Sequence, residues 1–290
     1  VCLTTILSLN VDVSVVIVNY NVKHFLEQVV LSVQKASKNL AVEILIVDNN
    51  SVDGSIEMMQ AKFPDVNLIT NKENVGFSKA NNQAIRIAQG KYVLLLNPDT
   101  IIEEDTLEKT FQFMEDHPDA GACGVKMIDG AGNYHRESKR ALPTPQVSFY
   151  KMTGLSKLFP KSSKFGKYYM THLDEDEINE IEVLAGCFMF MRKTALDKVG
   201  LLDEDFFMYG EDIDLSYRII KGGYKNYYYP ETRIIHYKGE STKKKNFNYV
   251  KIFYSAMIIF FNKHFTSSKD RAFANFIKFA IYGRASIAVI

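Results

Sequence analysis

The run VSVVIV at Val13–Val18 restricts the fold more than any other feature of the chain. Nearly all of its residues are β-branched and polar alternation is absent, which is typical of a strand buried on both faces. Apolar residues with helical spacing follow over His24–Val33, and Glu43–Val47 is again a short apolar strand. Together the three segments predict a βαβ unit and a central parallel sheet.

The same alternation continues along the chain. The next expected elements are a helix over 55–63, a strand over 66–70, a helix over 78–89 and a strand over 92–96. Strands that alternate with helices predict an α/β fold with helices on both faces of the sheet.

The rhythm stops after Asp129. The stretch to Phe165 contains prolines and scattered serines and lysines, so we expect a long loop or an irregular insertion there. The elements expected beyond it are a strand over 183–191, a helix over 211–220, strands over 224–229 and 233–236, and two aromatic-rich helices over 249–265 and 271–282.

The charge balance argues against a nucleic-acid partner. Lys and Arg number 35 and Asp and Glu 34, a formal net charge of +1, so no general field attracts a polyanion. Cys2, Cys123 and Cys187 are far apart and fit neither a disulfide framework nor a zinc site, which favours a reducing cytoplasmic compartment. No uncharged apolar run approaches the roughly 18 residues of a membrane-spanning helix.

Polar residues follow three of the expected strands, where ligands of open α/β sheets bind. They are Asn19-Tyr20-Asn21, then Asp48-Asn49-Asn50 with Ser51 and Asp53, then Asn97-Pro98-Asp99. Each cluster alone is compatible with ordinary turns and helix caps. Three clusters that converge on one sheet edge indicate a ligand site.

Glycine-loop phosphate binding does not fit the sequence. The Walker A pattern is absent, and the one GxG, Gly130-Ala131-Gly132, opens no helix after a first strand. A diphosphate ligand would therefore need a metal ion or cationic side chains.

Eight motifs in one order resemble family 2 inverting glycosyltransferases with the GT-A fold, particularly the bacterial rhamnosyltransferase-like branch. They are VSVVIVNYN, ILIVDNNSVDGS, NVGFSKANNQA, YVLLLNPDT, RALPT from Arg140, AGCFM from Ala185, YGEDIDL from Tyr209 and HYKGES from His236. The resemblance covers about residues 13–241.

The resemblance implies a sugar-nucleotide site. The donor-binding residues that it implies are Asn19, Tyr20, Asn21, Asp48, Asn50, Asn74, Gly76, Asn81, Asn97 and Asp99. Asp99 matches the last acid of the family's DXD element, and Asn97 replaces the first. Asp99 and His236 would hold a divalent cation, Mg²⁺ or Mn²⁺, on the donor diphosphate.

The resemblance makes Asp212 the general base that deprotonates the acceptor hydroxyl. Acidic residues at a helix N-terminus also favour the helix dipole, so capping alone could account for Glu211, Asp212 and Asp214. For Asp214 we favour capping or a bond to Arg218 at i+4. Contacts with the acceptor or the diphosphate are expected from Arg140, Gly186, Glu211 and Lys243, with Arg136 as an alternative. Lys243–Lys245 is either a solvated run or a lid over the donor.

These expectations give a division of the chain and a function. Residues 1–10 are a leader of uncertain origin, 11–246 a glycosyltransferase domain with a nucleotide-sugar half (11–125) and an acceptor half (126–246), and 247–290 a helical segment. We expect transfer of a sugar, dTDP-rhamnose being one candidate donor, to a bacterial surface polysaccharide or lipid-linked glycan. An inactive sugar-nucleotide-binding or scaffold protein is the alternative. The basic amphipathic C-terminal helices predict either contact with the inner membrane face or packing on this domain or a second subunit.

Overall fold

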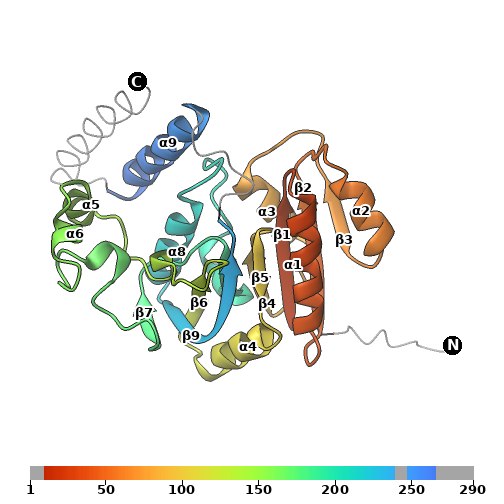
Figure 1. Cartoon of the computed structure of the whole chain (residues 1–290), viewed down its shortest axis with the longest axis horizontal. Helices are drawn as coiled ribbons and strands as arrows, with labels where there is room; N and C mark the ends of the chain where they lie inside the picture. The colour runs from red at the N-terminus through yellow and green to blue at the C-terminus, as the bar shows by residue number, and fades with distance from the viewer. Residues whose placement is uncertain (1–9, 239–246, 266–290) are drawn as a thin grey trace.

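The computed structural model describes residues 10–238 and 247–265. Within these ranges the strands form one sheet with the order β3-β2-β1-β4-β8-β6-β9-β5, and β7 pairs with β9 (Figure 1). The α/β class expected from the sequence is confirmed.

The first half of the sheet is parallel, as predicted. Its strands are β1 (Val13–Asn19), β2 (Val42–Asp48), β3 (Asn67–Thr70) and β4 (Tyr92–Leu96). The connecting helices are α1 (Lys23–Ala36), α2 (Ser55–Lys62) and α3 (Phe77–Ile85), the last ending before the predicted Gln89.

The second half of the sheet is mixed, so the expectation of a parallel sheet was wrong there. β8 (Phe188–Arg192) runs antiparallel between β4 and β6 (Ala120–Ile128). β9 (Lys225–His236) is parallel to β6 but antiparallel to β5 (Thr100–Ile102) and β7 (Asn179–Ile181). A strand buried on both faces has the same apolar composition in either direction, so its pattern does not encode orientation.

Several other elements differ from the sequence expectation. The expected irregular stretch contains α5 (Pro145–Met152) and α6 (Leu155–Leu158), and α5 starts with a Thr144 cap followed by proline. The two strands expected over 224–236 are one strand, β9, whose register with β6 shifts between Tyr229 and Arg233, around Pro230. The elements that the sequence reading missed are β5, α4 (Thr106–Asp116), β6, β7 and α7 (Lys193–Val199).

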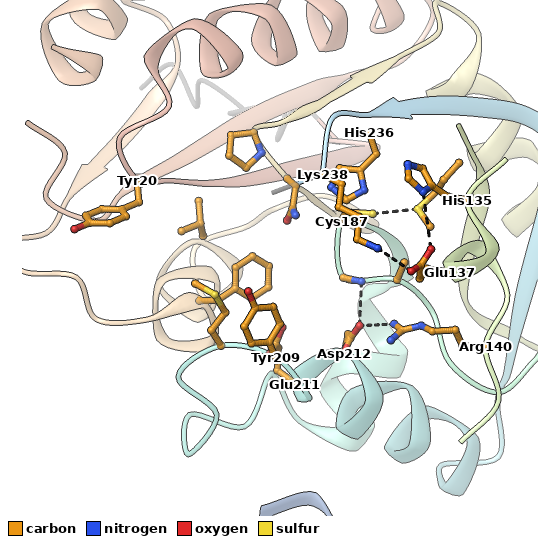
Figure 2. Close-up of a pocket in the computed structure, with 18 of the residues that line it drawn as sticks. Tyr20, His135, Glu137, Arg140, Cys187, Tyr209, Glu211, Asp212, His236 and Lys238 are labelled. Carbon is orange, nitrogen blue, oxygen red and sulfur yellow. Dashed lines mark hydrogen bonds and ion pairs between the residues drawn. The ribbon is translucent and has the colours of Figure 1, made fainter. Parts of the chain in front are cut away.

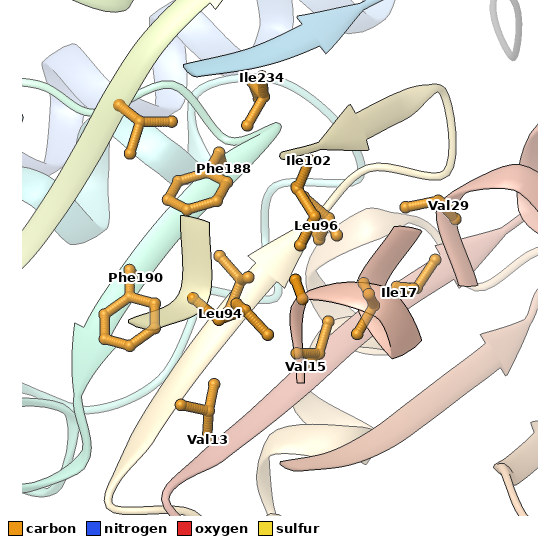
Figure 3. Close-up of a cluster of buried hydrophobic side chains, with 14 of the residues drawn as sticks. Val13, Val15, Ile17, Val29, Leu94, Leu96, Ile102, Phe188, Phe190 and Ile234 are labelled. Atoms are coloured by element: carbon orange, nitrogen blue, oxygen red, sulfur yellow. The ribbon is translucent and has the colours of Figure 1, made fainter. Parts of the chain in front are cut away.

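The core lies on both faces of the sheet because successive β1 side chains alternate. Val13, Val15 and Ile17 join a cluster that includes Val29 of α1 (Figure 3). Val16 and Val18 join a second cluster that includes side chains of α3 and α8 (Glu211–Lys221). Helices therefore pack on both faces, with the polar strand ends left at one edge.

The first C-terminal helix is present as α9 (Phe247–His264), which lies beside α8 (Figure 1). Its Phe260 ring contacts Tyr217 of α8, with ring centroids 6.3 Å apart. Among the described residues, no helix combines the length and the apolar character needed to cross a bilayer. The second expected helix, over 271–282, and residues 1–9 of the leader lie outside the described residues.

Candidate active site

A cavity of about 270 Å³ lies at the carboxyl edge of the parallel strands (Figure 2). The predicted site residues that line it are Tyr20, Asn74, Asn97, Arg140, Gly186, Glu211, Asp212 and His236. The structure thus brings residues from the first and second halves of the chain to one surface. Predicted residues outside the lining are Asn19, Asn21, Asp48, Asn50, Gly76, Asn81 and Asp99, while Lys243 lies outside the described residues.

The buried pair Asn19 and Asp48 joins the ends of β1 and β2, where the two residues face each other in register. Asn19 Nδ2 donates to Asp48 Oδ2 at 2.7 Å and to Ser51 Oγ at 3.0 Å, while the Ser51 N–H donates to Asp48 Oδ1 at 2.7 Å. Asn21 and Asn50 have φ of 54° and 69°, a region that asparagine tolerates better than most residues. This network shapes the loops beside the cavity.

Gly76, just before α3, allows a close approach between that helix and the loop that precedes α8. Its φ is 89°, and a Cβ there would lie 2.7 Å from atoms of Phe207. The Phe77 N–H donates to the Phe207 carbonyl at 2.7 Å. Asn81 is buried and donates to the Phe77 carbonyl at 2.9 Å, so it stabilises the first turns of the helix.

Asp99 and His236 meet because β5 and β9 pair with Thr100 opposite His236. His236 Nε2 lies 3.4 Å from Asp99 Oδ1, and both side chains are largely buried. Burial opposes protonation of His236, but contacts with Cys187 and Asp99 outweigh it and raise the His236 pKa to about 10.

Once a metal cation displaces the proton from His236, this pair suits a cation that is held partly by a substrate. Within the described ranges no cluster of three or more His, Cys, Asp or Glu side chains could hold a metal on its own. Mg²⁺ is commonly bound through one or two carboxylates, with substrate phosphates and water completing the shell. Asn97 adds a neutral oxygen to the cavity lining, and its buried Oδ1 has no hydrogen-bond partner within the described part of the chain. The donor set therefore fits a cation shared with a diphosphate.

Asp212 lies in the first turn of α8 and is held by groups from two other segments (Figure 2). Arg140 pairs with Asp212 Oδ2 and also donates to the Leu184 carbonyl at 2.6 Å. The Gly186 N–H donates to the same Oδ2 at 3.3 Å. A Cβ on residue 186 would lie 3.4 Å from Asp212 Cβ, so the backbone of this segment runs directly beside the Asp212 side chain. The carboxylate is thus oriented at the cavity wall.

Glu211 is the neighbouring acid and is almost completely buried, with 6% of its surface exposed. Burial, together with the charge of Asp212, raises the Glu211 pKa to about 8. Its Oε2 has no hydrogen-bond partner among the described residues. Burial therefore favours the neutral, protonated form of Glu211.

The bond predicted between Asp214 and Arg218 is confirmed, at 2.7 Å from Arg218 Nε to Asp214 Oδ2. The sequence did not indicate that Lys263 and His264 of α9 also contact Asp214, at 2.9 and 2.6 Å. Asp214 is fully buried, which opposes its ionisation, but these partners outweigh burial and lower its pKa. Asp214 therefore attaches α9 to the helix that carries Asp212.

The sequence reading missed several residues of the cavity wall, among them His135, Glu137, Cys187 and Lys238. Lys238 Nζ donates to Glu137 Oε1 at 2.8 Å, which places a cation on the same wall as His236 (Figure 2). Lys238 falls within the HYKGES motif, which could have indicated it. Glu137 and His135 come from the expected irregular stretch, where no periodicity singles out a residue.

The mixed sheet, with a polar cavity at its edge, defines the chain by class as a protein with the GT-A glycosyltransferase fold. The family model described as glycosyl transferase family 2 matches residues 14–200, and the chain belongs to this family. Its similarity to rhamnosyltransferases supports the rhamnosyltransferase-like branch.

Among curated relatives, the chain is 25% identical over 257 residues to an N-acetylglucosaminyl-diphospho-decaprenol L-rhamnosyltransferase of Mycobacterium tuberculosis, covering 85% of this chain and 82% of that protein. It is 32% identical over 173 residues to the rhamnosyltransferase WbbL of Escherichia coli, covering 56% and 61%. Among solved structures, a mannosyltransferase of Pyrobaculum calidifontis in complex with GDP-Man and Mn²⁺ matches with a TM-score of 0.60 at 16% identity, covering 97% of this chain and 74% of that one. This last likeness concerns the fold.

Proposed function

We propose that this protein transfers a sugar, with inversion at the anomeric carbon, from a nucleoside diphosphate donor to a hydroxyl of a bacterial surface polysaccharide or lipid-linked glycan. The observation that carries the proposal is the position of Asp212, which lines the same cavity as His236, the partner of Asp99. One wall then offers a base and the other offers groups suited to a diphosphate. Rhamnosyltransferases among the relatives make dTDP-rhamnose the first donor to test.

In this mechanism Asp212 accepts the proton of the attacking hydroxyl as the bond between the sugar and the diphosphate breaks. General-base help of this kind contributes about 10²–10⁴-fold to the rate. Arg140 and the Gly186 N–H hold the carboxylate, so little reorganisation is needed before attack. The raised pKa of Glu211 disfavours a second negative charge beside it.

Asp99 and His236 would hold Mg²⁺ or Mn²⁺, which when bound supplies Lewis-acid neutralisation of the leaving diphosphate. Lys238, which is paired with Glu137 in the cavity lining, is a further candidate for contact with the diphosphate. Tyr20 lines the cavity just after the end of β1, and Asn74 lines it just before the start of α3. The base and ribose of the donor are expected there. The loops that carry Tyr20 and Asn74 would be supported by predicted residues outside the cavity lining, namely Asn19, Asn21, Asp48, Asn50, Gly76 and Asn81.

The acceptor is proposed to be lipid-linked because the name of the M. tuberculosis relative specifies a diphospho-decaprenol substrate. Such an acceptor would bring the protein to the cytoplasmic face of the membrane as a peripheral enzyme. For residues 247–290 we propose contact with the membrane surface or with a second subunit in a homodimer.

The experiment is release of nucleoside diphosphate from a panel of sugar nucleotides, with and without Mn²⁺ and with a lipid-linked acceptor. We expect release with one donor, dependent on acceptor and cation. Tight donor binding without any release, across the panel, would instead favour a binding or scaffold protein.

A further inference from the structure

A second cavity, of about 310 Å³, lies between the loop that precedes α8 and the helix α9. This volume is at the lower end of ligand sites, which span about 300–1,000 Å³. Its lining is mainly apolar: Phe206, Phe207, Met208, Ile252, Ala256 and Ile259, with Asp205 and Ser255 as the polar members. It shares Met208, and no other lining residue, with the first cavity.

The second cavity adjoins the catalytic one. Met208 lines both, and the next residue, Tyr209, lines the catalytic cavity. The Tyr209 ring contacts Phe253 of α9, with centroids 6.0 Å apart. Phe207 and Phe253 are 42% and 38% exposed, so both rings present apolar surface to solvent. An apolar surface therefore runs from beside the base to α9.

The walls of this cavity are fixed to the catalytic helix. Tyr209 and Gly210 both have positive φ, 69° and 86°, so the loop turns sharply just before α8. A Cβ on Gly210 would lie 3.0 Å from the Phe206 ring and 3.3 Å from Ala256, which shows how closely the loop meets α9. Asp214 holds the far end of α9 through Lys263 and His264. The walls of the second cavity are therefore held in place by contacts with α8, the helix that carries Asp212.

We propose that this cavity binds the hydrocarbon chain of a lipid-linked acceptor. The bound segment is the part of the hydrocarbon that lies nearest the acceptor's diphosphate. The inference rests on the proposed function, since the glycan of the same molecule would reach Asp212 past Met208. An apolar cavity favours a polyisoprenoid or alkyl chain, because burial of apolar surface stabilises binding by about 25 cal/mol per Å². The aromatic and aliphatic walls provide no set of charges for a sugar or a phosphate.

The test measures binding of two probes, farnesyl diphosphate and ethyl diphosphate, to the full chain by calorimetry below the micellar concentration. Because the probes differ only in the hydrocarbon chain, the diphosphate contribution cancels. We expect farnesyl diphosphate to bind at least about tenfold more tightly, which corresponds to burial of about 60 Å² of apolar surface. Equal affinities would overturn the proposal.

Variants locate the effect. Ser255→Phe fills the cavity from an exposed helix position, and Ile252→Gln makes its wall polar, so both should remove the preference. Ser255→Ala is the matched control and should keep it. Retention of the preference by either of the first two variants in folded form, checked by thermal unfolding, contradicts the proposal. Its loss in Ser255→Ala does so too, since the hydroxyl would then control binding.

Donor turnover is measured on the same preparations. Tighter binding of farnesyl diphosphate, without nucleoside diphosphate release from any donor, would reject the proposed function and leave the assignment of the cavity standing. Nucleoside diphosphate release without a preference for farnesyl diphosphate would support the proposed function and reject the assignment of the cavity.

Discussion

Arg140 and Asp212, 72 residues apart in the chain, form an ion pair at the wall of the candidate active-site cavity. Arg140 reaches there from the irregular stretch after β6, and a second bond to the Leu184 carbonyl fixes its guanidinium. The pair gives the proposed base a defined orientation. It also gives Arg140 a partner within the chain, in addition to the contact with acceptor or diphosphate that its motif predicts.

The variant Asp212→Asn should abolish transfer and leave donor affinity within about twofold. A general base acts on the acceptor proton and contributes little to ground-state donor binding. Initial rates and donor titration of the purified variant check this. Loss of donor binding would reassign Asp212 to the donor pocket.

The variant Arg140→Ala should lower kcat by roughly 10–100-fold with the donor KM unchanged, because a misplaced catalytic group costs up to about 10²-fold. Arg140→Lys should recover part of this loss. Arg233→Ala is a control that removes an exposed pair with Glu103 outside the cavity. A raised donor KM with normal kcat in Arg140→Ala would indicate a diphosphate contact instead.

The variants Asp99→Ala and His236→Ala should each weaken Mn²⁺-dependent binding of nucleoside diphosphate by about tenfold or more, since each removes a proposed ligand of the cation. Titrations with Mn²⁺ and with EDTA measure the cation-dependent part. Full turnover in EDTA would refute the metal role and leave Lys238 and other cations to balance the diphosphate.

Glu211 predicts a pH dependence of stability. Its pKa rises from 4.5 to about 8 on folding, so the folded state binds more protons between these values and stability falls as pH rises through them. Glu211→Gln should remove this fall, and its advantage over the wild type should grow from pH 5 to pH 8. Urea unfolding of both proteins gives the difference curve. Parallel curves would show that Glu211 is ionised in both states.

Asp214 predicts that α9 depends on one buried carboxylate. Asp214→Asn should destabilise the protein by about 3 kcal/mol, the lower end for breaking a buried ion pair, because its partners are partly exposed. Lys263→Ala, which removes a one-third exposed partner, should cost less than about 1 kcal/mol. Urea unfolding supplies both values, and hydrogen exchange should show faster opening of α9 in Asp214→Asn. Equal stability of Asp214→Asn and wild type would contradict the assigned role.

The Asp214 carboxylate also predicts how the stability of the protein changes with pH. Its pKa is lowered in the folded state, so its contribution to stability is present above the unfolded value of about 3.8 and is lost as pH falls below it. Acid should therefore loosen α9 in the wild type.

The sequence by itself determined the parallel half of the sheet and most of the cavity's chemistry. Buried β-branched runs alternate with helical patterns there, and apolar burial acts on each segment locally. The motifs that contain Asn97, Asp99, Asp212 and His236 also stand out without any structure.

Only the tertiary structure decided which of these groups meet. An apolar strand such as β8 carries no sign of its direction, so the mixed half of the sheet depends on contacts between distant segments. The Asp99–His236 contact follows from pairing of β5 with β9, and Asp214 finds His264 across 50 residues. Charged pairs of this kind form between side chains whose separation in sequence is arbitrary, and no local periodicity records them.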